Sequence, residues 1–113
     1  MQTRHPLTAI NLMLDVVRRL APLVRTIEGD DKDLARQIRR SASSVVLNLG
    51  EADGSDPGNR RARLFTALGS LKETRQGLQI ATAWGYVATS DIAPIERVLD
   101  SATAMTWRRL HPR

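Results

Sequence analysis

The stretch QIRRSASSVVLNLGEADG, residues 37–54, decides the fold class of this chain. Its apolar residues recur at intervals of four and three, which places them along one stripe of an α-helix. Polar side chains that a purely structural helix would not need flank the stripe. The stripe consists of Ile38, Ala42, Val45, Leu49 and Ala52, and the flanking polar residues are Arg39, Arg40, Asn48 and Glu51.

Three further segments show the same helical periodicity, and none shows the alternation of a strand. We predict helices over residues 8–28, 31–53, 60–84 and 91–110, with a kink at Arg18–Pro22 because proline removes a backbone donor. Short connections between four amphipathic helices predict an all-α, antiparallel up-down-up-down four-helix bundle. At 113 residues we expect one domain, 1–113.

Composition narrows the class of protein. The chain has no cysteine, so thiolate metal sites and disulfides are excluded. It has no apolar run of the roughly 20 residues that a membrane span needs and no signal-peptide core, so we expect a soluble cytoplasmic protein without a membrane partner. The formal net charge is +5, carried mainly by arginine. Nucleic-acid binding explains this balance, and so does a GC-rich genome that favours arginine codons.

Two blocks of sequence carry a family resemblance. The first runs from Gln37 to Glu51 and the second from Ala67 to Glu73. Both resemble the bacterial four-helix-bundle family of proteins encoded by 23S ribosomal RNA intervening sequences, which includes the accessory variability protein of diversity-generating retroelements. The resemblance implies a four-helix bundle, a homo-oligomer with a pentamer favoured, and RNA or a reverse transcriptase as partners. Gly50 departs from the family pattern, which usually has alanine there.

The sequence lacks the residue combinations that catalytic and metal sites need. Metal-binding bundles use Glu-x-x-His pairs, but Gly54 follows Glu51 at that distance and Gln76 follows Glu73. The two histidines, His5 and His111, lie near the chain ends, so no serine has a histidine partner for nucleophilic catalysis. We therefore predict a protein that is not an enzyme, with no catalytic residues, no metal and no cofactor.

The polar residues of the motif blocks have a structural and a functional interpretation. When the second and third predicted helices fold back on each other, residues whose numbers sum to about 114 lie opposite. Glu51 then pairs with Arg63, Glu73 with Arg40, and Asn48 lies near Thr66. Under this interpretation Arg40, Asn48, Glu51 and Glu73 fix the helix register. The alternative is acid–base chemistry at the two glutamates and a functional role for Asn48.

Charge is uneven along the predicted bundle. One end collects arginines, while the other collects acidic residues. Acids at helix starts and bases at helix ends explain part of this asymmetry, but not the arginines at the start of the third predicted helix, where the dipole disfavours cations. We expect the nucleic-acid-binding residues to be Arg60, Arg61, Arg63, Arg108 and Arg109, with Trp107 as a stacking residue, and Arg4 and Arg113 share this end.

Two functional hypotheses follow. The first is a non-enzymatic oligomeric accessory protein that binds nucleic acid, with RNA favoured, through this basic surface. The second is a protein-interaction or self-assembly module with no nucleic-acid role. Apolar residues outside the core stripes support self-association in either case: Leu12, Leu23, Val46, Leu47, Ile80 and Trp84. Arginines that keep their charge free favour the first hypothesis, and arginines paired with acids favour the second.

Overall fold

The computed structural model describes residues 8–112 of the chain. Arg4 and Arg113, which the sequence places at the basic end, and His5 lie outside the described residues.

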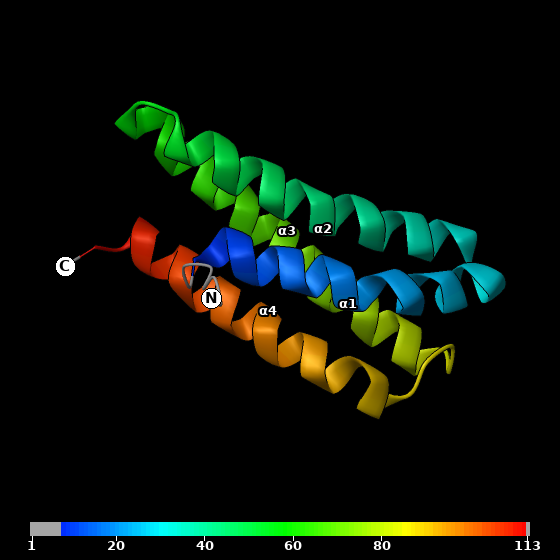
Figure 1. Ribbon diagram of the computed structural model, residues 1–113. Coiled ribbons are helices and arrows are strands. Elements are labelled where there is room, and N and C mark those ends of the chain that lie inside the picture. The colour runs from blue at the N-terminus through cyan, green and yellow to red at the C-terminus, as the bar shows by residue number, and fades with distance from the viewer. Residues whose placement is uncertain (1–7, 113) are drawn as a thin grey trace, which may run out of the picture.

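Four α-helices make up the fold between residues 8 and 112, and that range contains no strand. Helix α1 spans Ala9–Asp30, α2 spans Lys32–Asp53, α3 spans Pro57–Ala83 and α4 spans Thr89–Leu110. Consecutive helices run antiparallel, and each packs against two neighbours, with α4 returning to lie beside α1 (Figure 1). The fold is an antiparallel up-down-up-down four-helix bundle, as the periodicity predicts.

The apolar stripes form the bundle core. In α2 the five apolar stripe residues from Ile38 to Ala52 are almost completely buried, with Val45, Leu49 and Ala52 at 0% exposure. Met13, Leu71 and Leu99 come from the other three helices and are equally inaccessible. Burying apolar surface contributes roughly 25 cal/mol per Å², so this shared core is the main source of stability.

Helix capping sets the ends of α1 and α2. Thr8 Oγ1 accepts the Asn11 amide at 3.1 Å, which begins α1 at the predicted place. The predicted end at residue 28 is two residues early, because α1 continues to Asp30. Asp31 alone connects the first two helices: its N–H donates to the Ile27 carbonyl at 2.7 Å, and its Oδ1 accepts the Leu34 amide at 2.9 Å. One residue therefore closes α1 and opens α2.

The starts of α3 and α4 differ from the sequence prediction. Helix α3 begins at Pro57, before the predicted residue 60, because Asp56 Oδ1 accepts the Asn59 amide at 3.0 Å and proline suits a first helical turn. The same bond holds the pKa of the Asp56 carboxyl below its usual value. Helix α4 begins at Thr89 instead of residue 91. Asp91 caps it from inside, accepting the Ala88 amide at 2.9 Å.

Pro22 does not interrupt α1, which is continuous from Ala9 to Asp30. Pro22 is exposed, and so is Arg18, whose carbonyl loses its amide partner to the proline. The Thr26 hydroxyl donates to the Pro22 carbonyl at 3.3 Å. The kink expected at Arg18–Pro22 stays a prediction.

A chain of hydroxyl groups joins α2 to α3. Ser44 Oγ and Ser70 Oγ lie 2.8 Å apart, and Thr74 Oγ1 donates to Ser41 Oγ at 2.8 Å. Thr74 is fully buried, while Ser41 is 3% exposed. These contacts follow the predicted pairing of residues whose numbers sum to about 114. They supply hydrogen bonds to side chains that would be costly to bury alone.

Gly77 lets α3 approach α2 closely. A Cβ atom at this position would lie 2.7 Å from Ile38 Cγ1, inside normal contact distance. Gly50 and Gly69 have no such neighbour among the described residues, since a Cβ at either would meet nothing within 4 Å. Among these three glycines, close approach to a neighbouring helix is therefore confined to Gly77.

Candidate nucleic-acid interface at one end of the bundle

The basic end is the end of the bundle where α1 and α3 begin and α2 and α4 finish (Figure 1). We use this name for the described residues that the topology gathers there. The start of α3 and the end of α4 bring together arginines that lie up to 49 positions apart in sequence. They are Arg60, Arg61, Arg63, Arg108 and Arg109, and their acidic neighbours are Glu51, Asp53 and Asp56.

Two arginines of the basic end form ion pairs. Arg63 Nε lies 2.9 Å from Glu51 Oε2, the pair that the antiparallel register predicts. Arg109 Nη2 donates to Asp53 Oδ1 at 2.7 Å, a pair that the sequence does not predict. The side chains of both pairs are between 36% and 56% exposed, so each pair stabilises the fold by at most about 1 kcal/mol. Their charges are nevertheless largely neutralised locally.

Arg61 is held in place by groups that carry no negative charge. Its Nη1 donates to the Leu110 carbonyl at 3.1 Å, which satisfies one of the free carbonyls at the end of α4. Its guanidinium also lies 5.0 Å from the centre of the Phe65 ring. These contacts orient the cation and do not neutralise its positive charge.

Arg60 and Arg108 have no acidic group within ion-pair distance among residues 8–112. Both side chains are exposed. Arg60 lies in the first turn of α3, where the helix dipole disfavours a cation. Together with Arg61, these residues leave three guanidinium groups at the basic end without a carboxylate from the described part of the chain.

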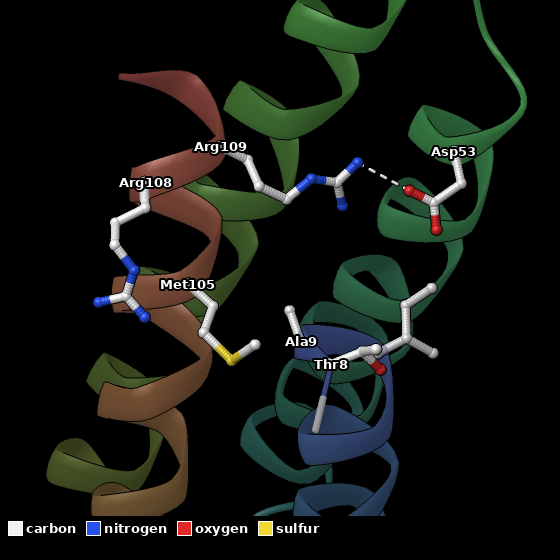
Figure 2. A pocket seen from close by; sticks show the side chains of 7 residues that line it. Thr8, Ala9, Asp53, Met105, Arg108 and Arg109 are labelled. Atoms are coloured by element: carbon white, nitrogen blue, oxygen red, sulfur yellow. Dashed lines mark hydrogen bonds and ion pairs between the residues drawn. The ribbon is translucent and has the colours of Figure 1, made fainter. Parts of the chain in front are cut away.

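The surface between these arginines is hollowed. One hollow, of about 500 Å³, lies where α1 begins beside the ends of α2 and α4. Figure 2 shows Arg109 reaching across to Asp53 above the first turn of α1, while Arg108 extends along the outside of α4. The lining residues are Thr8, Ala9, Ile10, Asp53, Met105, Arg108 and Arg109.

A second hollow, of about 180 Å³, lies on the other side of Arg109. Arg60 and Arg61 line it from α3, and Leu110 and Pro112 line it from the end of the chain. Arg109 borders both hollows, so its pairing with Asp53 also fixes the wall between them. Arg60, Arg61 and Arg108 therefore each border one of two hollows at the basic end.

Trp107 is 53% exposed and has a ring partner that the sequence prediction does not include. The ring centres of Trp107 and His111 lie 3.6 Å apart, with 26° between the ring planes. The spacing of four residues on one helix could have revealed the pair, because side chains at i and i+4 are neighbours.

Comparison with known proteins identifies the relatives of this bundle. The model of the 23S rRNA-intervening sequence protein family matches residues 7–108. The chain belongs to this family. No protein with a curated description matches it.

A solved structure has the same fold as this 23S rRNA-intervening sequence protein. It is the crystal structure of a protein of unknown function from the S23 ribosomal protein family of Bacteroides thetaiotaomicron. The TM-score is 0.83 at 19% sequence identity, over 91% of this chain and 98% of the other. At that identity the likeness concerns the fold alone.

The predicted pair of Arg40 with Glu73 is wrong for this family member. No ion pair joins them in the described structure, and both side chains are exposed. The helix register is as predicted, but at this level the buried Ser41–Thr74 pair occupies the contact between α2 and α3. Arg40, one position earlier on α2, is turned about 100° away from Ser41 around the helix axis.

Asn48 also has partners other than the predicted one. Its Nδ2 donates to the Ser44 carbonyl at 2.9 Å and to Ser44 Oγ at 3.1 Å, both within α2. Thr66 is exposed, and its hydroxyl donates to the Ala62 carbonyl at 3.1 Å. Asn48 therefore extends the hydroxyl chain along α2 and does not cross to Thr66.

The described residues of the protein offer little for other chemistry. Between residues 8 and 112, no three acidic or histidine side chains gather in a way that could hold a metal ion. In the same range, no helix has the length and apolar character needed to cross a membrane. Every fully buried side-chain polar atom there has a hydrogen-bond partner, so none is left aimed at an absent ligand.

Proposed function

We propose that this member of the 23S rRNA-intervening sequence protein family is a non-enzymatic, cytoplasmic accessory protein that binds RNA through the basic end of its bundle. The observation that carries the proposal is a set of three arginines, Arg60, Arg61 and Arg108, that have no acidic partner among residues 8–112 and so keep their charge. Guanidinium groups match the geometry of phosphate oxygens, so these side chains suit a nucleic-acid backbone.

The arrangement supports backbone binding that is independent of base sequence. Arg63 and Arg109 are paired with Glu51 and Asp53 of α2, so their charges are less available to a ligand than those of the other three arginines. The free arginines lie around the two hollows, where a curved phosphate chain can approach from outside. Each phosphate neutralised releases counterions, and binding of this kind weakens steeply as salt rises.

The test is charge reversal at two of these arginines, Arg60→Glu combined with Arg108→Glu. The probe is a synthetic RNA stem–loop, and binding is measured by fluorescence anisotropy from about 50 to 200 mM salt. We expect weaker binding to every sequence, and a logarithmic salt slope shallower by roughly 0.7–0.9 for each phosphate that is no longer neutralised. Arg61 is left unchanged because its hydrogen bond to Leu110 supports the end of α4.

The matched control is Arg25→Glu combined with Arg97→Glu. Both arginines are exposed, lie toward the opposite end of the bundle and have no acidic partner among the described residues. The control changes the net charge by the same amount, so it should reduce binding far less. Equal losses in the two double variants would mean that only overall charge matters, and unchanged binding in the first would reject the basic end as the site.

A second candidate is a self-assembly module, and a different observation favours it. Leu47, Ile80 and Trp84 are 65%, 44% and 71% exposed, which is unusual for large apolar side chains. Their burial against further copies would give a homo-oligomer, and the resemblance noted in the sequence favours a pentamer. A reverse transcriptase or another protein is the alternative occupant. Light scattering tests self-assembly: a mass near 12.5 kDa at tens of micromolar would reject it.

A further inference from the structure

The contact between α3 and α4 carries a line of aromatic and cationic side chains at the basic end. Arg61 and Phe65 belong to the first turns of α3, and Trp107 and His111 lie at the end of α4. We call these four residues the aromatic strip. Its members are brought together only by the fold, because the two halves are more than forty positions apart in sequence.

Hydrogen bonds between α3 and α4 show which residues of the two helices lie opposite each other along the bundle axis. Gln79 Nε2 donates to Glu96 Oε2 at 3.3 Å, and Arg61 Nη1 donates to the Leu110 carbonyl at 3.1 Å. The numbers of two residues that lie opposite each other across this pair of helices therefore add up to about 171–175. Phe65 consequently lies at the level of the last turn of α4, the turn that carries Trp107 and precedes His111.

Each large ring of the strip is supported by one partner and open elsewhere. The Arg61 guanidinium lies over the Phe65 ring, and the His111 ring stacks on Trp107. Phe65 nevertheless remains 49% exposed and Trp107 53% exposed. A ring that is held by one neighbour and open to solvent can accept a second planar group at low entropic cost.

We propose that the aromatic strip binds unpaired bases, so that the RNA taken by the basic end is a single-stranded segment or loop and not a plain duplex. This inference rests on the proposed function, since the arginines would hold the backbone while the rings stack the bases. Every base has a π-face, so stacking of this kind tolerates any sequence. A duplex hides those faces inside its base stack and offers the strip only phosphates.

The two tryptophans of the chain make a direct test possible, because Trp84 and Trp107 lie at opposite ends of the bundle. In Trp84→Phe the fluorescence comes from Trp107 alone, and in Trp107→Phe from Trp84 alone. The probes are an RNA hairpin with an eight-base loop and a fully paired RNA of equal length. We expect the hairpin to quench Trp84→Phe as it binds, the paired RNA to leave its emission nearly unchanged, and neither RNA to quench Trp107→Phe.

Affinity supplies the second measurement. Trp107→Ala and Phe65→Ala should each weaken hairpin binding by roughly 5- to 100-fold, while changing affinity for the paired RNA by less than about twofold. Both side chains are exposed, so circular dichroism should show an unchanged fold. Equal affinity for both RNAs without quenching would show that the aromatic strip does not bind unpaired bases, and would still be compatible with RNA binding by the basic end. Binding of neither RNA would overturn both, and concentration-dependent Trp107 emission without RNA would assign the strip to a protein contact.

Discussion

The Tyr86 hydroxyl donates a hydrogen bond to Asp31 Oδ2 at 3.2 Å, which ties the connection between α3 and α4 to the connection between α1 and α2. Asp31 also caps α2 through its other carboxylate oxygen. Burial raises the pKa of Tyr86, and the negative charge of Asp31 raises it further. This one contact therefore links the two connections at the end of the bundle opposite the basic end.

Titration of Tyr86 tests that contact. It is the only tyrosine, so tyrosinate absorbance reports on it alone, and its midpoint should lie above the ordinary value of about 10. Because the folded pKa exceeds the unfolded one, the stabilisation is complete below the unfolded pKa and is lost as pH rises through the folded pKa. Asp31→Asn keeps a capping side chain and should lower the midpoint. A midpoint at the ordinary value in the wild-type chain would contradict the geometry.

Alanine at Gly77 should destabilise the bundle, whereas alanine at Gly69 should stabilise it. The added methyl at Gly77 meets Ile38 Cγ1 at 2.7 Å, and overpacking of this kind costs roughly 1–3 kcal/mol. At Gly69 nothing in the described structure lies within 4 Å of the new Cβ, so the gain is the helix preference of roughly 0.5–1 kcal/mol. Urea unfolding followed by circular dichroism measures both, and equal effects would deny the close approach of α2 and α3.

Removal of a buried hydroxyl should cost more than removal of an exposed one. Thr74→Val deletes a hydroxyl that lies 2.8 Å from both Ser41 Oγ and the Ser70 carbonyl oxygen at a fully buried position, with an expected loss of roughly 1–2 kcal/mol. Thr66→Val is the matched control, since its exposed hydroxyl donates to the Ala62 carbonyl of its own helix. The control should stay within about 0.5 kcal/mol of the wild type. Thermal unfolding compares the two, and similar melting temperatures would refute a contribution from the hydroxyl chain.

The Arg109–Asp53 pair should act as a weak, salt-sensitive link between α2 and α4, which lie diagonally across the bundle. A double-mutant cycle with Arg109→Ala and Asp53→Ala should give a coupling energy below about 1 kcal/mol, because both side chains are partly exposed. The coupling should shrink further at about 1 M salt, where charges are screened within about 3 Å. A coupling of several kcal/mol that persists in high salt would show that the pair is a main structural tie.

The sequence alone determined the helices and their order. Apolar spacing marks the buried stripe of α2 from Ile38 to Ala52, because a helix exposes the same face every three to four residues. Antiparallel folding about the turn near Pro57 then predicts which residues of α2 and α3 lie opposite each other, and it correctly places Glu51 beside Arg63. The same rule places Ser44 level with Ser70. These results depend on local periodicity and chain geometry, which the sequence contains in full.

Side-chain direction at each level was decided by the tertiary structure. Arg40 and Glu73 share a level but point to solvent, and Asn48 turns back to Ser44, because rotation about the helix axis selects the residues that meet. Contacts between distant helix ends, such as Arg109 with Asp53 and Arg61 with Leu110, depend on how all four helices close together. Among residues 8–112 the sequence places five arginines at one end. Only the packed bundle determines which of these five keep their charge free for a ligand.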